Sequence, residues 1–288
     1  MPKARIIKII SNQYTVFTEE GERLLAIAMG KLRLKKSPVV GDWVQVDRLE
    51  DKWGIQLVEE RFNELTRPLI ANVDQAMIVT SLIQPDFSPI LLDRLIFLIS
   101  YANIVPVIVV TKCDLLPKDD PVYQIIAEYQ KADYQVLFTG RDMPVDNIMA
   151  ALKGKVTVLT GQSGAGKSSL INRIDGSFEL ITQEISKALG RGKHTTRHSE
   201  LHYVAEGWVA DTPGFSSLDF SMIDKDIFRW IVPDFKPYMG KCKFRNCMHE
   251  NEPGCAVKEA VSKNEVSKIR YENYVECLKM IEEERKPL

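Results

Sequence analysis

GQSGAGKS, residues 161–168, is the stretch that decides the fold. It fits the phosphate-binding pattern G-x-x-x-x-G-K-[ST] at every fixed position. The apolar run Val156–Thr160 before it predicts a buried strand, and Lys167–Ile174 after it predicts the start of a helix. In such a loop, backbone N–H groups and the positive end of the helix surround phosphates. The sequence therefore predicts an α/β nucleotide-binding domain.

Two side chains of this loop have predicted roles in chemistry. Lys167 is expected to reach the β- and γ-phosphates as a catalytic group, and the Ser168 hydroxyl is expected to bind Mg²⁺. The glycines let the backbone turn inward, so that N–H groups point at the phosphates. The predicted phosphate-binding set is Gly161, Gln162, Ser163, Gly164, Ala165, Gly166, Lys167, Ser168 and Ser169.

A second polar turn follows another apolar run. Trp208–Ala210 leads into Asp211-Thr212-Pro213-Gly214, about forty-five residues after the phosphate loop. Asp211 is expected to hold Mg²⁺ through water, and the Gly214 N–H is expected to meet the γ-phosphate. The pattern D-x-x-G is weak alone, because Asp and Gly are common in turns. Its position after a complete phosphate loop makes it a candidate switch element.

A candidate base reader lies about fifty residues before the phosphate loop. The predicted strand Val105–Val110 ends in the segment Thr111, Lys112, Cys113, Asp114. The Asp114 carboxylate can accept hydrogen bonds from both N1–H and the N2 amino group of guanine, which adenine does not offer in that arrangement. The Lys112 stem can lie along the base, so the segment favours GTP. Thr111 stands where asparagine is usual, which predicts that some loop-bracing hydrogen bonds are lost.

The order of these motifs is inverted relative to an ordinary GTPase, in which the phosphate loop comes first. Circular permutation explains the order, because ligands of a doubly wound sheet bind at strand ends wherever the chain is cut. With these motifs, the chain resembles the circularly permuted GTPase family RsgA, ribosome small subunit-dependent GTPase A, over nearly its whole length. The resemblance implies hydrolysis of GTP to GDP and phosphate, activated by the small (30S) ribosomal subunit. It also implies a role in late small-subunit biogenesis through rRNA binding.

The segment Leu189–His198 is a candidate mobile switch. It carries two glycines and five basic or imidazole groups, a poor composition for a core. Either Thr195 or Thr196 would close on Mg²⁺ and the γ-phosphate when GTP is bound. Phe215 occupies the place where many GTPases have a water-orienting glutamine. His194 is the candidate replacement, and a flexible, solvated or RNA-contacting basic loop is the alternative.

Four metal-ligating residues cluster near the C-terminus. Cys242, Cys247, His249 and Cys255 supply three thiolates and one imidazole within fourteen residues. This is a complete tetrahedral set for one structural Zn²⁺ per chain, with no open position for catalysis. Disulfides are the alternative, but a leaderless chain that binds GTP belongs in a reducing compartment. The sequence therefore predicts a zinc-binding module.

The first sixty or so residues contain short strand-like runs separated by turn signals. Such a pattern suits a small β-barrel, and the resemblance implies an OB-fold that binds nucleic acid on one face. Lys31–Lys36 places basic side chains beside a predicted strand. A solvated loop or an rRNA contact both account for that run, and the resemblance favours the contact.

Length and composition complete the prediction. The chain has 288 residues, 45% of them hydrophobic, with a net charge of −1, so RNA contacts must come from local basic patches. We expect an OB-fold RNA-binding domain at 1–64, a circularly permuted α/β P-loop GTPase domain at 65–222 and a zinc-binding helical module at 223–288. With no membrane-spanning run and no leader at Met1–Ile10, we expect a cytoplasmic monomer that does not bind membranes.

Two other functional classes use some of the same features. A metabolic ATPase or kinase would share the phosphate loop, and Asp114 separates it from a GTPase. A non-catalytic RNA-binding scaffold would hold a structural nucleotide, and Lys167→Ala separates it from an enzyme.

Overall fold

The structure is a computed structural model, and it describes residues 1–29, 37–50, 52–66, 69–176, 200–211, 220 and 223–284. The predicted RNA-contacting run Lys31–Lys36 and the predicted switch positions His194, Thr195, Thr196 and Gly214 lie outside these residues. Within the described part of the chain, no helix is long and apolar enough to cross a membrane.

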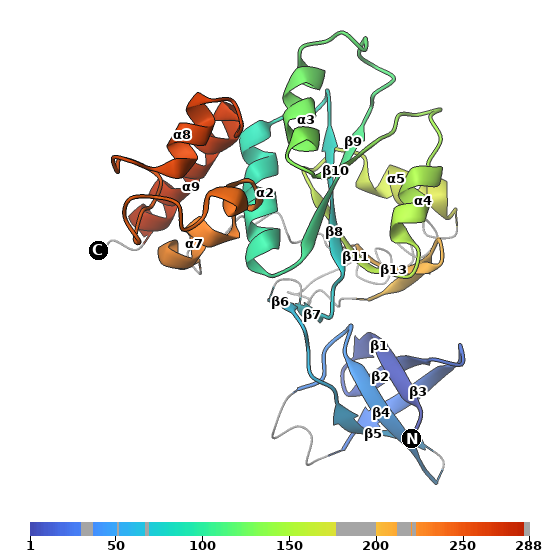
Figure 1. The fold of residues 1–288 in the computed structure, drawn as a ribbon. Helices are drawn as coiled ribbons and strands as arrows, with labels where there is room; N and C mark the ends of the chain where they lie inside the picture. The colour runs from blue at the N-terminus through green and yellow to red at the C-terminus, as the bar shows by residue number, and fades with distance from the viewer. Residues whose placement is uncertain are drawn as a thin grey trace. The chain divides into compact units, whose positions relative to one another are not determined.

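The first five strands close into a barrel (Figure 1). They are β1 (Lys3–Ile10), β2 (Gln13–Thr18), β3 (Arg23–Ala28), β4 (Trp43–Leu49) and β5 (Lys52–Val58). Around the barrel the order is β1-β2-β3-β5-β4, with β3 parallel to β5 and β1 antiparallel to β4. Alternate side chains such as Val44 and Val46 are fully buried, as period-two patterning requires. This five-stranded barrel confirms the expected OB-fold.

A short hairpin follows the barrel, formed by β6 (Glu64–Thr66) and β7 (Leu69–Ala71). The Ala71 N–H donates to the Val40 carbonyl at 2.9 Å, and Asn72 Nδ2 donates to the Gly41 carbonyl at 3.2 Å. Gly41 has a φ of +90°, and a Cβ built there would lie 2.0 Å from the Ala71 carbonyl oxygen. Only glycine therefore permits this close backbone approach between barrel and hairpin.

Replacing Gly41 with alanine is expected to lower the free energy of unfolding by about 2–4 kcal/mol, because the methyl group adds a backbone clash to the left-handed strain. Gly21→Ala is the matched control. Gly21 has a φ of +89°, and a Cβ added there would meet no heavy atom within 4 Å, so only the conformational strain of about 1 kcal/mol applies. Denaturant unfolding measures both, and equal losses in the two variants would contradict the clash.

A six-stranded sheet has the order β10-β9-β8-β11-β13-β12. Its strands are β8 (Gln75–Ser81), β9 (Val105–Thr111), β10 (Gln135–Phe138), β11 (Val156–Gly161), β12 (His202–Val204) and β13 (Gly207–Asp211). The pairs β9–β10 and β11–β13 are parallel, and β12 is antiparallel to β13. Strand β8 is buried along its whole length, which explains its near-continuous apolar sequence.

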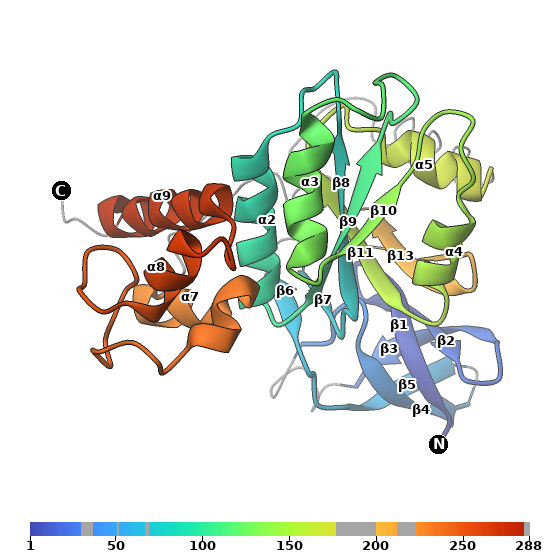
Figure 2. The same ribbon diagram turned by 45° about the horizontal axis from the view of Figure 1, so that its top comes forward.

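Helices connect these strands. They are α2 (Pro89–Tyr101), α3 (Val122–Lys131), α4 (Asp146–Leu152) and α5 (Lys167–Ile174). α2 packs against β9 and α3 against β10 (Figure 2), whereas α4 packs against β13. The Ser88 side chain accepts from the Leu91 N–H and Pro89 begins α2, a favourable start for a helix.

The chain divides into two compact units. The first comprises Met1–Ala76, Pro144–Thr160 and Lys167–Phe215, which includes the barrel, β11, β13, α4 and α5. The second comprises Met77–Met143, Gly161–Gly166 and Ser216–Leu288, which includes β9, β10, α2, α3 and the C-terminal helices.

The C-terminal helices surround an aromatic core. They are α7 (Lys225–Ile231), the 3₁₀ helix η1 (Pro233–Tyr238), α8 (Ala256–Ser262) and α9 (Lys268–Glu284). Phe228 stacks on Tyr274 with ring centroids 5.0 Å apart and meets Phe97 of α2 edge-on at 5.4 Å. Leu278 and Ile281 of α9 are also buried. The apolar stripe of α9 therefore packs against α2, beside which α9 lies in Figures 1 and 2.

A buried cluster of charged side chains links α9 to α2. The Arg270 guanidinium lies 3.0 Å from Asp93 Oδ1 and 2.5 Å from Asp234 Oδ1, and it donates to the Tyr134 hydroxyl at 2.9 Å. It also lies over the Tyr129 ring, 4.6 Å from the centroid. Since Arg270 and Asp93 are almost fully buried, removing either partner would leave an uncompensated charge in the core.

Candidate functional site

The phosphate loop sits where β11 ends and α5 begins. Gly161 has a φ of +128°, and a Cβ there would lie 2.0 Å from the Val79 carbonyl oxygen of β8. Gly164 and Gly166 also have left-handed backbone, with φ of +78° and +96°. α5 then begins at Lys167, as the sequence predicted. The three glycines therefore allow the turn that aims successive N–H groups inward.

Thr111, at the end of β9, braces this loop. Its hydroxyl donates to the Ala165 carbonyl at 2.6 Å and lies 3.2 Å from the Thr80 carbonyl oxygen. Thr111 is 5% exposed and Ala165 is fully buried, so no water competes for this bond. Threonine therefore keeps a loop-bracing contact through its hydroxyl. A hydroxyl has one hydrogen to donate where an asparagine amide has two, so the expected loss of some bracing hydrogen bonds stays a prediction.

Replacing Thr111 with valine is expected to weaken nucleotide binding roughly tenfold. Valine keeps the shape but leaves the buried Ala165 carbonyl without its donor, which costs about 1–3 kcal/mol. Thr111→Ser is the matched control, because it keeps the hydroxyl. Titration with fluorescent GDP measures both variants, and equal affinities for serine and valine would contradict the bracing role.

The base-reading residues converge at the ends of β9 and β10. The Cys113 N–H donates to the Thr139 carbonyl at 3.2 Å, and the Arg141 N–H donates to Asp114 Oδ1 at 3.0 Å. A Cβ on Gly140 would lie 2.3 Å from Asp114 Oδ1, so glycine keeps room for the carboxylate. Asp114 itself is exposed, as a residue that accepts from a ligand must be.

The Cys113 thiol, within the predicted base-reading segment, is hydrogen-bonded to the backbone and is not a reactive group. Its Sγ donates to the Val110 carbonyl at 3.4 Å, and burial raises the pKa of the thiol. A protonated, hydrogen-bonded thiol is a poor nucleophile. Cys113 is therefore a structural member of the segment.

The segment Ser81–Phe87, after β8, is a part of the site that sequence reasoning missed. Lys112 Nζ donates to the Gln84 carbonyl, and Ser81 Oγ donates to the Pro85 carbonyl at 2.7 Å. A Cβ on Gly164 would lie 3.5 Å from Pro85 Cδ. The segment thus contacts the lysine of the predicted base reader and lies next to the phosphate loop. The sequence signal that could have found this segment is the Gln84-Pro85 dipeptide at the end of a strand, because proline marks turns.

The strand register relates Asp211 to the strand before the phosphate loop. β11 and β13 are parallel, and Asp211 pairs with Leu159. Leu159 lies two residues before Gly161. Ser168 is exposed in the first turn of α5. The register therefore places the end of β13 beside the strand that leads into the phosphate loop.

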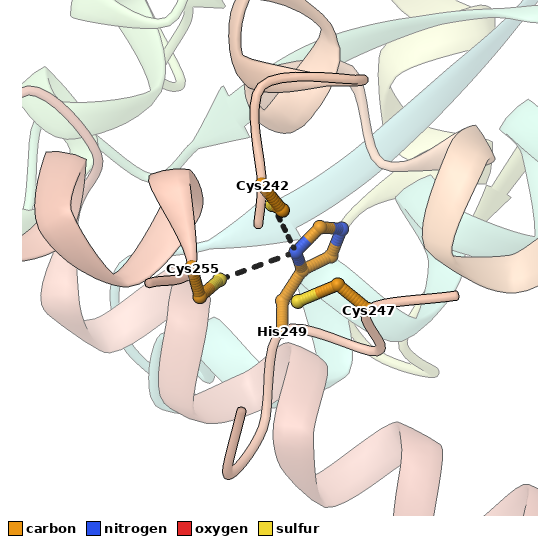
Figure 3. Close-up of side chains that lie close together, drawn as sticks. All are labelled: Cys242, Cys247, His249 and Cys255. Carbon is orange, nitrogen blue, oxygen red and sulfur yellow. Dashed lines mark hydrogen bonds between the residues drawn. The ribbon is translucent and has the colours of Figure 1, made fainter. Parts of the chain in front are cut away.

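The four predicted zinc ligands come together between η1 and α8 (Figure 3). Their ligand atoms all lie within 4.8 Å of one another. His249 Nδ1 is 3.6 Å from Cys242 Sγ and 3.3 Å from Cys255 Sγ. In a tetrahedral Zn²⁺ site, bond lengths of about 2.3 Å to sulfur and about 2.0 Å to nitrogen give a sulfur–nitrogen separation of roughly 3.6 Å. The donor set and its spacing fit Zn²⁺.

The surroundings affect the thiols and the imidazole of this cluster differently. Burial raises the pKa of Cys247 to about 12 and lowers the pKa of His249. The imidazole is therefore neutral and ready to ligate, whereas the thiol needs a metal to lose its proton. Backbone N–H groups of Ala256 and Lys258 donate to Cys242 Sγ and Cys255 Sγ at 3.4 and 3.5 Å, which stabilises thiolates.

Aromatic residues hold the metal loop in place. The Tyr271 hydroxyl donates to the His249 carbonyl and the Tyr274 hydroxyl to the Met248 carbonyl, both at 2.8 Å. His249 adopts a left-handed φ of +61°. Its Nδ1 is the ring nitrogen that lies near Cys242 Sγ and Cys255 Sγ, so Nδ1 is the candidate ligand atom.

Comparison with known proteins gives consistent matches. The model of the RsgA GTPase family matches residues 58–221. The small ribosomal subunit biogenesis GTPase RsgA 2 of Oceanobacillus iheyensis is 45% identical over 293 residues, which cover 100% of this chain and 99% of the relative. The small ribosomal subunit biogenesis GTPase RsgA of Bacillus subtilis is 43% identical over 298 residues, with the same coverage.

Two solved structures share the fold. The circularly permuted GTPase YloQ has a TM-score of 0.86 and 38% identity, covering 100% of this chain and 97% of its own. YjeQ from Thermotoga maritima has a TM-score of 0.85 and 33% identity, covering 97% of this chain and 98% of its own. The similarity extends over the barrel, the sheet and the C-terminal module.

Proposed function

Because the chain belongs to the RsgA GTPase family, we propose that it hydrolyses GTP to GDP and phosphate when activated by the small ribosomal subunit. The proposed role is in late small-subunit biogenesis, in the cytoplasm, as a monomer that binds rRNA. Support comes from relatives named for small ribosomal subunit biogenesis, which match the chain from end to end.

The observation that carries the GTPase assignment is the hydrogen bond from Thr111 to Ala165. It joins the base-reading segment to the phosphate loop although the two lie in reversed order along the chain. Asp114, three residues after Thr111, is the residue that separates a GTPase from a kinase or ATPase that uses only the phosphate loop.

We assign the chemical steps as follows. Lys167 would neutralise charge on the β- and γ-phosphates, Ser168 would bind Mg²⁺, and Asp211 would hold Mg²⁺ through water. Asp114 reads the guanine edge. Mg²⁺, when bound with GTP, supplies charge neutralisation at the transferring phosphate, and the protein arranges in-line attack by water rather than forming a covalent bond.

The switch residues complete this proposal. Thr195 or Thr196 closes on Mg²⁺ and the γ-phosphate, and the Gly214 N–H meets that phosphate. With phenylalanine at position 215, the attacking water lacks the usual glutamine, and His194 orients it instead. This arrangement predicts slow turnover alone and faster turnover on the small subunit.

The zinc module and the barrel supply the RNA contacts in this proposal. Cys242, Cys247, His249 and Cys255 would hold one Zn²⁺, which would stabilise the loop between η1 and α8 beside the aromatic core of the module. Lysines and arginines near the metal, and those of the Lys31–Lys36 run, contact rRNA phosphates. Such contacts weaken steeply as salt rises.

Asp114→Asn tests the base-reading assignment. Asparagine presents an amide donor in place of a carboxylate oxygen, so binding of GTP is expected to fall by about 1–3 kcal/mol, roughly 5- to 150-fold. Xanthosine triphosphate carries an oxygen where guanosine triphosphate carries the N2 amino group, so its binding is expected to rise. Competition binding with GTP, ATP and xanthosine triphosphate measures the preference. An unchanged preference would remove Asp114 as the reader and favour the ATPase alternative.

A further inference from the structure

Two large aromatic rings are exposed beside the metal cluster. Trp230, on α7, is 48% exposed, and Phe244, in the metal loop between Cys242 and Cys247, is 41% exposed. Tryptophan and phenylalanine usually lie mostly buried, and their neighbours Phe228 and Phe235 are buried here. The module thus builds an aromatic core and leaves these two rings outside it.

Arg229 fixes the position of Trp230 relative to the metal loop. Its guanidinium donates to the Arg245 carbonyl at 3.1 Å and to the Cys247 carbonyl at 3.3 Å, and its carbon lies 5.4 Å from the Trp230 ring centroid. Arg229 therefore connects the helix that carries Trp230 with the loop that carries Phe244.

The same surface is basic. Residues 236–248 contain four cationic side chains and no carboxylate. All four are exposed, and none forms an ion pair with a carboxylate of the described chain. They are Lys236, Lys241, Lys243 and Arg245. The Lys243 ammonium lies over the Phe244 ring, 5.6 Å from its centroid, so a cation stands over one face of the ring.

We propose that Trp230 and Phe244 form a stacking platform for unpaired RNA bases, with Lys241, Lys243 and Arg245 contacting the adjoining phosphates. A nucleotide presents a flat ring and an anionic phosphate a few ångströms apart, which matches a ring beside a cation. The inference rests on the proposed function, because it names the part of the RNA that this module contacts.

The observations favour unpaired RNA over the other partners. In a duplex the bases stack on each other and offer side chains only edges, sugars and phosphates, so exposed rings would gain nothing. A protein partner is disfavoured by charge, because lysine is depleted at the centre of protein interfaces and three basic residues flank Phe244 within five positions.

The test uses the full-length, zinc-loaded protein and the variants Trp230→Ala, Phe244→Ala and Trp230→Phe. The probes are a mixed-sequence single-stranded RNA, its fully paired duplex and purified small ribosomal subunits. Each alanine variant is expected to bind the single strand about 5- to 150-fold more weakly, with duplex binding unchanged. Trp230→Phe keeps a ring and is expected to retain most of the affinity. Stacking of a base on Trp230 would quench the fluorescence of that tryptophan. Single-stranded RNA should therefore quench tryptophan fluorescence less in Trp230→Phe than in the wild-type protein.

Zinc content and basal GTP turnover, measured on the same samples, confirm that each variant is folded. Unchanged single-strand binding in both alanine variants, or an equal loss for duplex, would overturn the proposal. A loss seen with small subunits but not with free single-stranded RNA would assign the face to a protein partner instead. If wild-type turnover did not respond to small subunits, the proposed function would fail whatever these variants showed.

Discussion

Replacing Lys167 with alanine is expected to lower GTP turnover at least about a hundredfold, with or without small subunits. The ammonium group stabilises charge that develops on the transferring phosphate, and losing a preorganised group of this kind costs roughly 3 kcal/mol of transition-state stabilisation. Binding of RNA is expected to stay unchanged, because the side chain belongs to the nucleotide site. Single-turnover and steady-state GTP hydrolysis, with filter binding of RNA, measure these effects.

Lys153→Ala is the matched control for Lys167→Ala. Lys153 precedes β11, its side chain is 64% exposed, and it pairs only with the exposed Glu206 among the described residues. Exposed ion pairs contribute at most about 1 kcal/mol, so turnover should not change. Near-normal turnover in Lys167→Ala would contradict the catalytic role of Lys167. Loss of turnover with RNA binding intact is expected only if hydrolysis is a distinct activity, which the scaffold alternative lacks.

Replacing Cys247 with serine is expected to remove most of the bound zinc and to unfold the metal loop. A serine hydroxyl ligates Zn²⁺ poorly at neutral pH, and structural Zn²⁺ contributes about 10–16 kcal/mol of binding free energy in small modules. Elemental analysis measures the zinc. Protease sensitivity of the chain after Lys236 measures the unfolding.

Cys277→Ser separates metal loss from ordinary core disruption. Cys277 is fully buried on α9, and burial raises the pKa of its thiol to about 12. It lies outside the cluster of four ligands. This variant is expected to lose about 1–3 kcal/mol of stability but to keep its zinc. Equal zinc contents in Cys247→Ser and Cys277→Ser would exclude Cys247 as a ligand.

Local patterns predicted most of the fold and much of the site. Helix α5 begins at Lys167, where the phosphate-loop pattern predicted the start of a helix. The strands before the base reader and before the phosphate loop were also predicted, because short buried strands carry continuous apolar runs. The zinc quartet was predicted because its four ligands are close in sequence and chemically specific.

Long-range contacts were beyond sequence reasoning. Arg270 and Asp93 are separated by 177 residues. No local sequence pattern predicts that these two charged side chains are buried together. The approach of Gly41 to Ala71 depends on backbone geometry in two segments at once. The contact of Thr111 with Ala165 was not predicted either, because the acceptor is a backbone carbonyl, which leaves no pattern in the sequence.

GTP turnover with and without purified small ribosomal subunits, at equal Mg²⁺ and salt, tests the central claim most directly. The account predicts slow turnover by the protein alone, because Phe215 replaces the water-orienting glutamine, and strong stimulation by the subunits. No stimulation, with GTP still bound, would contradict it. The chain would then remain a permuted GTP-binding protein whose activating partner is something other than the small subunit.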